Sequence, residues 1–536
     1  MIFRLARAAI LAAPFAAGEI RFQDLALPAG LAFKLENSPT PAKHLPETMA
    51  GGVAAFDYDG DGRTDIFFTN GAAMPTLVKD GARYRNRLFR NLGAWKFRDV
   101  TTEAGLGGAG YSMAALAGDF DDDGHVDLFV AGVRHNILYR NRGDGGFDDV
   151  TAKAGIGSAE WSIGGAWVDF DNDGLLDLFV VNYVDWTPAF DQFCGDAARN
   201  IRVYCHPRLF KGTANRLYRN LGNGRFADVS IESGVAAHVG KGMAVAVADY
   251  DGDGRPDLFV TNDKMPNFLF HNLGQGRFEE VAFAVGVALV DTGTEMSAMG
   301  VDFRDVANSG SPDIVATALA GETFPFFRNL GKGSFADSGF VSKLGVLSRI
   351  YSGWGIGIFD FDNDGWKDIF TANSHVSDRV EAFEATAYRQ HNIVFRNTGA
   401  GRFEASSRFD GQSAQAHRGC AFADFDDDGR IDVVVSSLGA GPELWRNVSA
   451  PDSAWLVVKL TGVKSNRDGI GAVVRIGDQT NHMTASVGYA SSSHFGVHFG
   501  LGRRKEIERM EIMWPSGTRQ TVRNVKTNQI LPVIER

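Results

Sequence analysis

Short apolar runs alternate with acidic and glycine-rich segments along most of the chain. In the clearest unit, an apolar run at residues 165–168 enters an acidic loop, and a second run at residues 178–181 leaves it. Two further runs, like those at residues 136–141 and 147–151, complete a unit and are joined by a Gly-rich turn. Runs of about four to six residues bounded by Gly and Asn are typical of β-strands. The pattern predicts units of four short strands joined by tight turns, not helices.

A nine-residue acidic pattern, Asp-x-Asp-x-Asp-Gly-x-x-Asp, separates the first two strands of each unit. A degenerate copy runs from Asp305 through Ala307 to Asp313, with Asp302 as an alternative first residue. All copies start 50 to 80 residues apart, and a period of about 50 residues is that of one propeller blade. The sequence therefore predicts an all-β protein built on a seven-bladed β-propeller. The complete copies begin at residues 57, 119, 169, 249, 360 and 424.

The number of strands also predicts how the ring of blades closes. A third strand ending in Arg-Asn or His-Asn occurs seven times, whereas a fourth strand that begins with Phe occurs only six times. No such fourth strand follows Asn447. Because an unpaired strand edge favours aggregation, we expect the N-terminal segment around Phe33, Lys34 and Leu35 to supply the missing strand.

Carboxylates at positions one, three, five and nine of a loop can converge on one hard cation. Gly at position six permits the sharp turn, and position seven offers its carbonyl oxygen. An EF-hand would need Glu at position twelve and flanking helices, but position twelve is apolar or Thr and the flanks read as strands. The pattern therefore predicts Ca²⁺ in about six loops. The expected ligands are Asp57, Asp59, Asp61, Arg63, Asp65, Asp119, Asp121, Asp123, His125, Asp127, Asp169, Asp171, Asp173, Leu175, Asp177, Asp249, Asp251, Asp253, Arg255, Asp257, Asp360, Asp362, Asp364, Trp366, Asp368, Asp424, Asp426, Asp428, Arg430 and Asp432.

The overall charge is consistent with cation binding. The chain has 54 Lys and Arg against 65 Asp and Glu, a formal net charge of −11. Much of the acidity lies in the loops, where clustered carboxylates would repel one another without cations. A net negative charge also argues against nucleic acid as a partner.

The N-terminus has the features of an export signal. Arg4 and Arg7 precede an apolar run at residues 8–17, and small residues follow as a cleavage site, so we expect a signal at residues 1–18. A disordered apolar start is the alternative. The run is too short to span a bilayer, and no later stretch is long enough. These features predict a secreted, extracellular or periplasmic protein that does not cross a membrane.

The cysteines fit an exported protein. Cys194 and Cys205 lie in one insertion and can close a local disulfide, with two free thiols as the alternative. Cys420 lies in an apolar strand pattern, as expected of a small core residue.

The C-terminal region forms a second unit in this interpretation. After the propeller at residues 19–450, residues 451–536 contain further short apolar runs, which predict a small β-sandwich-like domain. The clearest runs lie at residues 455–458, 472–476 and 510–514.

These repeats resemble the FG-GAP/VCBS repeats of calcium-loop propellers related to the integrin α head. The C-terminal region resembles an ASPIC/UnbV domain through residues 462–472, 488–493, 498–502 and 514–517. The combination is similar to the cartilage acidic protein family and its bacterial relatives. This resemblance implies an extracellular calcium-binding protein linked to matrix or adhesion, without a firmly assigned reaction. The degenerate fifth loop departs from the repeat pattern.

The long insertions, residues 182–214 and 371–391, are expected on the face opposite the acidic loops, which is the better ligand surface. Amides and aromatic rings recur at strand ends on that face, and together they would suit a sugar ring. The alternative is that they cap strands and pack blades. The candidates are Asn70, Tyr111, Trp161, Asn182, Asn262, Tyr351 and Asn373.

The favoured hypothesis is a calcium-dependent binding or adhesion protein with a glycan or extracellular protein as its ligand. The rival is a carbohydrate-active enzyme such as a polysaccharide lyase, which needs a base and basic residues near an acidic sugar. A cluster of Arg202, His206 and Arg208 on the insertion face would favour the rival. The sequence contains no HExxH, GxSxG, Walker-type or CxxC motif.

Overall fold

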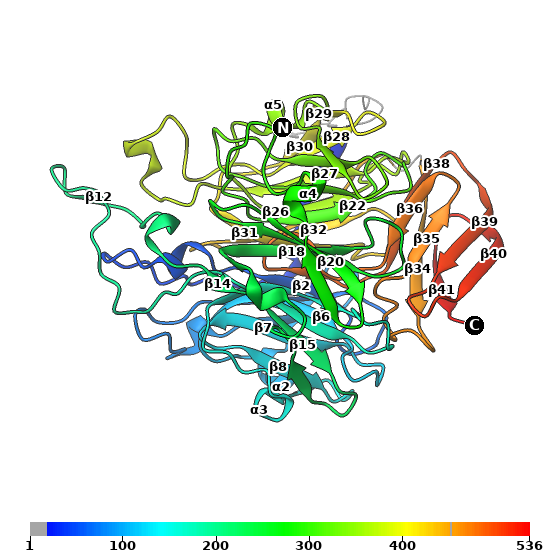
Figure 1. Cartoon of the computed structure of the whole chain (residues 1–536), viewed down its shortest axis with the longest axis horizontal. Helices are drawn as coiled ribbons and strands as arrows, with labels where there is room; N and C mark the ends of the chain where they lie inside the picture. The colour runs from blue at the N-terminus through cyan, green and yellow to red at the C-terminus, as the bar shows by residue number, and fades with distance from the viewer. Residues whose placement is uncertain (1–18, 451–452) are drawn as a thin grey trace, which may run out of the picture.

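The computed structural model describes residues 19–450 and 453–536, so the predicted export signal lies outside the described residues. Within them the chain is all-β, and seven sheets of similar build follow one another. Figure 1 shows these sheets gathered into one body, with the C-terminal sheets at one side. The helices are single turns, of which most follow a fourth strand. They are α1 (Ala26–Ala29), α2 (Thr101–Ala104), α3 (Thr151–Ala154), α4 (Ala282–Val285) and α5 (Leu344–Ser348).

The first six sheets each pair four antiparallel strands in chain order. The first three contain β2 (Val53–Phe56), β3 (Asp65–Phe68), β4 (Arg87–Asn91) and β5 (Phe97–Asp99); β6 (Tyr111–Gly118), β7 (Asp127–Val133), β8 (Ile137–Asn141) and β9 (Phe147–Asp149); and β10 (Ser162–Val168), β11 (Asp177–Asn182), β15 (Arg216–Asn220) and β16 (Phe226–Asp228). The next three contain β18 (Gly242–Ala248), β19 (Asp257–Asn262), β20 (Phe268–Gly274) and β21 (Arg277–Glu280); β22 (Val301–Arg304), β23 (Asp313–Ala316), β24 (Phe326–Asn329) and β25 (Phe335–Asp337); and β26 (Gly353–Phe359), β27 (Asp368–Asn373), β28 (Ile393–Asn397) and β29 (Phe403–Ala405).

The seventh sheet takes its fourth strand from the N-terminus. Its strands β31 (His417–Ala423), β32 (Asp432–Ser437) and β33 (Glu443–Asn447) are followed by β1 (Ile20–Asp24), which pairs antiparallel with β33. A fifth strand, β30 (Ser407–Asp410), lies parallel to β1.

An N-terminal closing strand was expected at Phe33–Leu35, and this placement is wrong. That segment contributes only an isolated bridge between Leu35 and Leu438. Ile20 and Phe22 point into the core at alternate positions of β1. Phe22 stacks on Phe409 with ring centroids 4.8 Å apart. Phe33 and Leu35 also pack against the core, so the difference lies in backbone pairing: β1 pairs along its length with β33 and β30, whereas the 33–35 run makes one bridge.

Replacing Phe22 with Ala is expected to lower the free energy of unfolding by about 3–5 kcal/mol, since a fully buried ring leaves a cavity. Chemical denaturation monitored by tryptophan fluorescence would measure the change. Leu27→Ala is the matched control, because Leu27 lies three residues beyond β1 and is 91% exposed. Equal stability of the two variants would contradict a closing role for β1.

The Asn that ends each third strand links neighbouring sheets. Asn141 donates from Nδ2 to the carbonyl oxygen of Val126 in its own loop (3.0 Å) and of Tyr58 in the preceding loop (2.8 Å). The equivalent Asn91 of the first sheet donates to the Phe425 carbonyl of the seventh (3.2 Å), so the series of links returns to its start. The first strands of successive sheets also contact one another, and β2 contacts β31. This arrangement is propeller-like.

A segment of the C-terminal region, residues 485–495, lies among these first strands, and we call it the central segment. Its strand β37 (Ser492–Ser493) pairs parallel with β2, and Gly488 exchanges backbone hydrogen bonds with Val301 of β22. Tyr489 is fully buried and donates to the Met49 carbonyl (2.8 Å). Serine hydroxyls bond the backbone of four more first strands, at Ala117, Gly165, Val245 and Phe422. The central segment therefore ties together first strands of six of the seven sheets.

The rest of the C-terminal region forms two small sheets. One sheet has the strand order β38-β34-β41, and the other has the order β36-β35-β39-β40. Their apolar faces share a core that includes Leu456, Val474 and Trp514. The strands are β34 (Ala454–Thr461), β35 (Val473–Ile476), β36 (Gln479–His482), β38 (Val497–Gly502), β39 (Glu506–Met513), β40 (Arg519–Lys526) and β41 (Gln529–Ile534).

Candidate metal centres in the acidic loops

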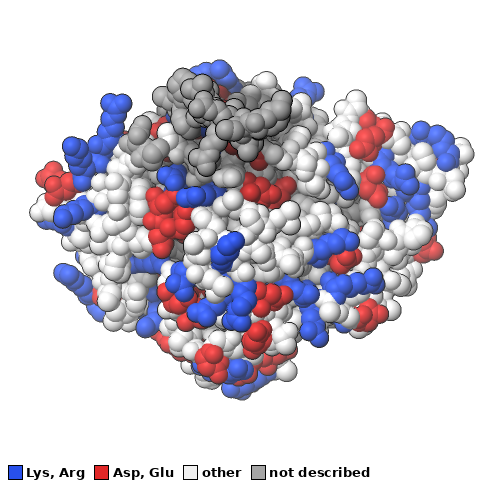
Figure 2. All heavy atoms as spheres, turned by 180° about the vertical axis from the view of Figure 1, so that it is seen from behind, with Lys and Arg blue, Asp and Glu red and all other residues white. Residues whose placement is uncertain are grey.

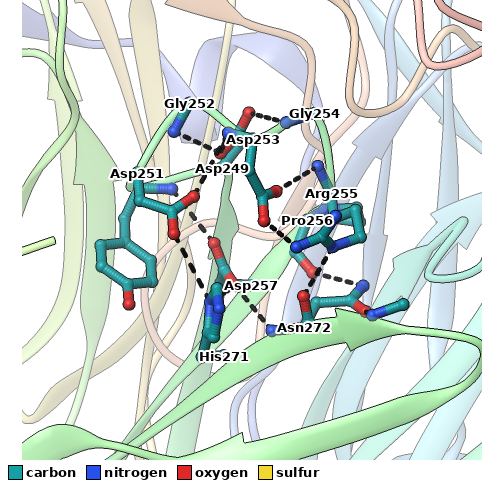
Figure 3. A network of polar contacts seen from close by, with 12 residues as sticks. Asp249, Asp251, Gly252, Asp253, Gly254, Arg255, Pro256, Asp257, His271 and Asn272 are labelled. Atoms are coloured by element: carbon teal, nitrogen blue, oxygen red, sulfur yellow. Dashed lines mark hydrogen bonds and ion pairs between the residues drawn. The ribbon is translucent and has the colours of Figure 1, made fainter. Parts of the chain in front are cut away.

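Each acidic loop curls around the carboxylate of its first Asp. In the loop at residues 249–257, Asp249 accepts hydrogen bonds from the backbone N–H groups of Gly252 and Gly254, both at 2.8 Å (Figure 3). Gly254 has a φ of +86°, a left-handed conformation that favours glycine. The Gly at position six is thus required by the turn that the first carboxylate organises.

The ninth position joins the loop to the third strand. Asp257 is fully buried and accepts from the backbone N–H of Tyr250 (3.2 Å) and of Asn272 (2.8 Å). The fifth position, Asp253, accepts from the N–H of Arg255 (2.9 Å). The third position, Asp251, accepts a longer bond from the N–H of Asp253 (3.3 Å), so backbone donors hold all four carboxylates in place.

The carboxylate oxygens come close enough to share one ion. Within three of the complete loops, ligand atoms of positions one, three and nine lie within 4.8 Å of one another. A further group joins Asp251 and Asp253 to His271 of the third strand. The first loop has a similar group at positions one, three and five, Asp57, Asp59 and Asp61. The sets at positions one, three and nine include Asp119, Asp121 and Asp127; Asp169, Asp171 and Asp177; and Asp249, Asp251 and Asp257.

The carboxylate at position three shows whether a cation would fit the loop. In four complete loops one oxygen of its carboxylate, Oδ1, is buried and has no hydrogen-bond partner. A buried carboxylate oxygen without a partner is costly, and a hard cation that prefers oxygen ligands would satisfy it. The residues present therefore fit Ca²⁺. The four residues are Asp59, Asp121, Asp171 and Asp426.

A basic side chain of the third strand, Arg in five loops and His in one, lies beside each complete loop and was not predicted from the sequence. In the first loop, Arg90 pairs with Asp59 (2.7 Å) and Asp61 (3.1 Å) from the third strand. The sequence signal for this side chain is the Arg-Asn or His-Asn ending of the third strand. The Arg residues offset part of the loop charge at positions three and five, whereas His271 contacts positions three (Asp251, 3.7 Å) and nine (Asp257, 3.1 Å). The equivalent residues are Arg140, Arg219, His271, Arg396 and Arg446.

Burial makes the loop carboxyl groups difficult to ionise without a cation. It raises the pKa of Asp65 to about 8, and the pKa values of Asp119, Asp169 and Asp424 to about 7. Desolvation is the main cause in all four, and neighbouring loop carboxylates add to it. The charged form is therefore the one that a bound cation would stabilise.

A pH dependence follows from these raised pKa values. The metal-free folded protein holds more protons than the unfolded chain between the ordinary pKa of 3.8 and about 8, so its stability falls as pH rises through that range. Calcium binds the ionised loops, so its stabilising effect should grow over the same range. Melting temperatures with calcium and with chelator should therefore diverge from pH 5 to pH 8. A constant difference would contradict this prediction.

The fifth loop differs in its chemistry. Ala307 at position three and Ser309 at position five replace carboxylates of the other loops, although Asp305 still accepts from the N–H of Gly310 (2.8 Å). The buried ammonium of Lys367, from the sixth loop, donates to the Asp305 carbonyl (2.7 Å). A basic side chain of the neighbouring loop thus donates a hydrogen bond into this loop, and burial lowers the pKa of that side chain.

The side chains proposed for the ligand face are mostly buried, so this proposal needs correction. Asn70, Asn182, Asn262 and Asn373 are fully buried, and their amides donate to backbone carbonyls, as in the bond from Asn182 to Ala214 (2.9 Å). The aromatic candidates pack instead of facing solvent. Tyr111 and Trp161 are buried, and Tyr351 is half-buried against Phe395. These side chains therefore cap strands and pack blades, as in the alternative interpretation of the sequence.

The insertions form a cap with the N-terminal segment. Lys43 pairs with Asp378 (2.6 Å), and Tyr204 donates to the fully buried Glu47 (3.1 Å). The disulfide between Cys194 and Cys205 closes the first insertion. Figure 1 shows the arm that bears β12 (Gly195–Asp196) on the side of the body away from the C-terminal sheets.

The basic residues that a lyase would need make their contacts within the first insertion. Arg202 pairs with Asp191 (2.6 Å), and His206 accepts from the N–H of Arg208 through Nδ1 (3.1 Å). Figure 2 shows Lys and Arg side chains interspersed with Asp and Glu over the described part of one face. Within the described residues, no helix is long and apolar enough to cross a membrane.

Two family models match the chain. The FG-GAP-like repeat model matches residues 57–130, 119–180, 209–260, 249–316, 305–371 and 381–435, and the ASPIC and UnbV model matches residues 462–536. Cartilage acidic protein 1 of Homo sapiens is 28% identical over 318 residues, which cover 58% of this chain and 46% of that protein. The Xenopus tropicalis protein of the same name is 28% identical over 328 residues, covering 58% and 47%. The chain spans about half the length of these relatives.

Solved structures that resemble the chain are more distant. A lectin of Agrocybe aegerita that recognises non-reducing terminal N-acetylglucosamine is 18% identical, with a TM-score of 0.40 over 73% of this chain and 87% of the lectin. An exotype rhamnogalacturonan lyase is 12% identical, with a TM-score of 0.33 over 93% of this chain and 92% of the lyase.

Proposed function

Because the chain belongs to the FG-GAP-like repeat family and ends in an ASPIC and UnbV domain, we propose that it is an exported calcium-binding protein that binds an extracellular glycan or protein. The observation that carries the proposal is the buried, unpartnered carboxylate oxygen at position three of four loops. An all-oxygen ligand set of this kind suits a hard cation such as Ca²⁺. The proposed ligands are the carboxylates of the complete loops and the carbonyl at position seven.

The proposed architecture is a seven-bladed propeller that closes through its N-terminal strand, followed by a C-terminal domain from about residue 451. The circular series of Asn links and the contact between β2 and β31 support it. Export is supported by the disulfide between Cys194 and Cys205, because disulfides persist mainly in oxidising compartments.

The proposed ligand surface lies on the two insertions. Arg199 stacks over Phe383 (5.2 Å to the ring centroid), and Arg202 stacks over Phe193 (5.8 Å). Phe193 is 42% exposed and Phe383 is 46% exposed. Exposed aromatic rings with stacked Arg are typical of binding surfaces, where such residues contribute much of the affinity. These side chains replace the buried Asn and aromatic candidates.

A binding screen would test this surface. The calcium-saturated protein is passed over acidic and neutral polysaccharides and over extracellular matrix proteins, and both retention and chain cleavage are scored. We expect retention, and we expect the double variant Phe193→Ala/Phe383→Ala to weaken binding at least about tenfold.

The control is the double variant Phe283→Ala/Phe340→Ala, which removes two phenylalanines that are 66% and 63% exposed elsewhere on the chain. If this control weakened binding and the insertion variant did not, the proposed surface would be wrong. Cleavage of a polysaccharide that chelator abolishes would contradict a purely binding role and favour the lyase alternative.

A further inference from the structure

The C-terminal domain covers some acidic loops and leaves others open. At the loop of residues 119–127, the Arg467 N–H donates to Asp122 (2.9 Å), and the Asp119 N–H donates to Asp468 (2.9 Å). Asp468 is in turn paired with His494 (3.1 Å) of the central segment. This loop is therefore in direct contact with the C-terminal domain through two hydrogen bonds, each from a backbone N–H to a carboxylate.

Three more complete loops are covered in the same way. At two of them the contact is so close that a side chain would not fit in place of a glycine. A Cβ atom added to Gly174 of the loop would lie 2.8 Å from the Lys464 carbonyl oxygen, and one added to Gly500 of the C-terminal domain would lie 1.9 Å from a carboxylate oxygen of Asp360. At the last loop, His498 lies 3.2 Å from the Gly429 carbonyl oxygen. The first Asp of each covered loop is at most 7% exposed.

The loops at residues 57–65 and 249–257 have no such cover. Cβ atoms on Gly62 and Gly254 would meet nothing within 4 Å, and Asp57 and Asp249 are half-buried. A cavity of about 200 Å³ lies between the second of these loops and the C-terminal domain, and its lining also includes Asp169 of the covered loop at residues 169–177. A cation in either loop could exchange with solvent without any movement of the domain.

We infer that the C-terminal domain acts as a lock on the cations of four loops, so that the protein has two kinetic classes of calcium site. The inference rests on the proposed calcium binding. Release from a covered loop requires the domain to lift, and that opening adds to the barrier for dissociation. The linkage is reciprocal, because a cation that neutralises a loop also favours docking of Asp468 beside Asp119.

Calcium release from the full-length protein tests the inference. The calcium-loaded protein is mixed with excess fluorescent chelator in a stopped-flow instrument. We expect two phases, with about a third of the ions leaving at least about tenfold faster than the rest. The variants Asp59→Asn and Asp251→Asn should remove amplitude from the fast phase. The variants Asp121→Asn and Asp362→Asn should remove amplitude from the slow phase.

A second variant addresses the lock itself. Trp455 packs against the turn of the last loop, where a Cβ on Gly429 would lie 1.9 Å from its ring. Trp455→Ala should accelerate part of the slow phase and leave the fast phase unchanged. Phe283→Ala is the control, since this exposed ring lies outside the acidic loops and the C-terminal domain. If Trp455→Ala fails to fold, hydrogen exchange is measured on two wild-type amides that donate to covered loops, Arg467 to Asp122 and Gly502 to the Asn363 carbonyl (2.8 Å). Both amides should exchange more slowly when calcium is bound.

The outcomes separate the two proposals. Bound calcium that leaves in one phase, with all loop variants reducing the same phase, would overturn the lock and leave calcium binding intact. Absence of bound calcium would overturn both. Two phases whose amplitudes do not follow the covered and open loops would also overturn the lock.

Discussion

Removal of calcium by a chelator is expected to lower the melting temperature of this protein by on the order of 10 °C or more. A ligand present at tenfold excess over its dissociation constant contributes about 1.4 kcal/mol per site. Six independent sites would contribute about 8 kcal/mol, which is comparable to the whole stability of an ordinary domain. The metal-free loops would lose further stability near neutral pH, because burial opposes ionisation of carboxyls such as Asp65.

Differential scanning calorimetry with and without calcium would measure the effect. Asp59→Asn removes one proposed ligand and should lower the number of bound ions by about one, with a smaller fall in melting temperature. Asp80→Asn is the matched control, because Asp80 is exposed and lies outside the acidic loops. An unchanged melting temperature in chelator would refute calcium as a structural part of this protein.

Replacement of Gly488 with Ala is expected to destabilise the protein strongly, by on the order of 3–5 kcal/mol. Gly488 has a φ of +75°, and a Cβ atom there would lie 2.5 Å from the Ile356 carbonyl oxygen. Backbone atoms of a first strand cannot yield to that contact locally, so the central segment or the strand must shift. Hydrogen bonds from the central segment to several sheets would weaken together.

Gly477→Ala is the control for this experiment. Gly477 has a similar φ of +64°, but the nearest atom to an added Cβ is the flexible end of Arg504 at 3.4 Å. This control should show only the cost of a left-handed residue with a side chain, about 1–2 kcal/mol. Urea denaturation of both variants would compare them. Equal destabilisation would mean that the central segment does not hold the first strands together.

The acidic loops show how far local sequence can specify a structure. The turn around Asp249, the Gly at position six and the convergence of carboxylates all depend on residues within nine positions of one another. The Asn at the end of the third strand was also visible in the sequence. Its bond to the preceding loop was not, because that contact joins residues such as Asn141 and Tyr58 that are far apart in the chain.

The closing strand shows a feature that the local sequence does not specify. Both Ile20–Asp24 and Phe33–Leu35 are short runs with apolar residues, and neither has a turn that fixes its partner. The choice between them depends on whether the buried face fits between β33 and β30, which lie about 400 positions further along the chain. Likewise, the ligand-face candidates had suitable side chains at strand ends, but packing of the neighbouring loops buried them.

The sequence by itself determined the all-β repeats, the loop chemistry that suits a hard cation, and the presence of a second β-rich unit. These properties follow from periods and spacings of fewer than about ten residues within repeats of about 50. Only the tertiary structure decided that Ile20–Asp24 completes the seventh sheet and that residues 485–495 lie among the first strands. It also decided which loops the C-terminal domain covers. The physical reason is that these contacts depend on burial and backbone pairing between segments hundreds of residues apart, which leave no periodic trace in the chain.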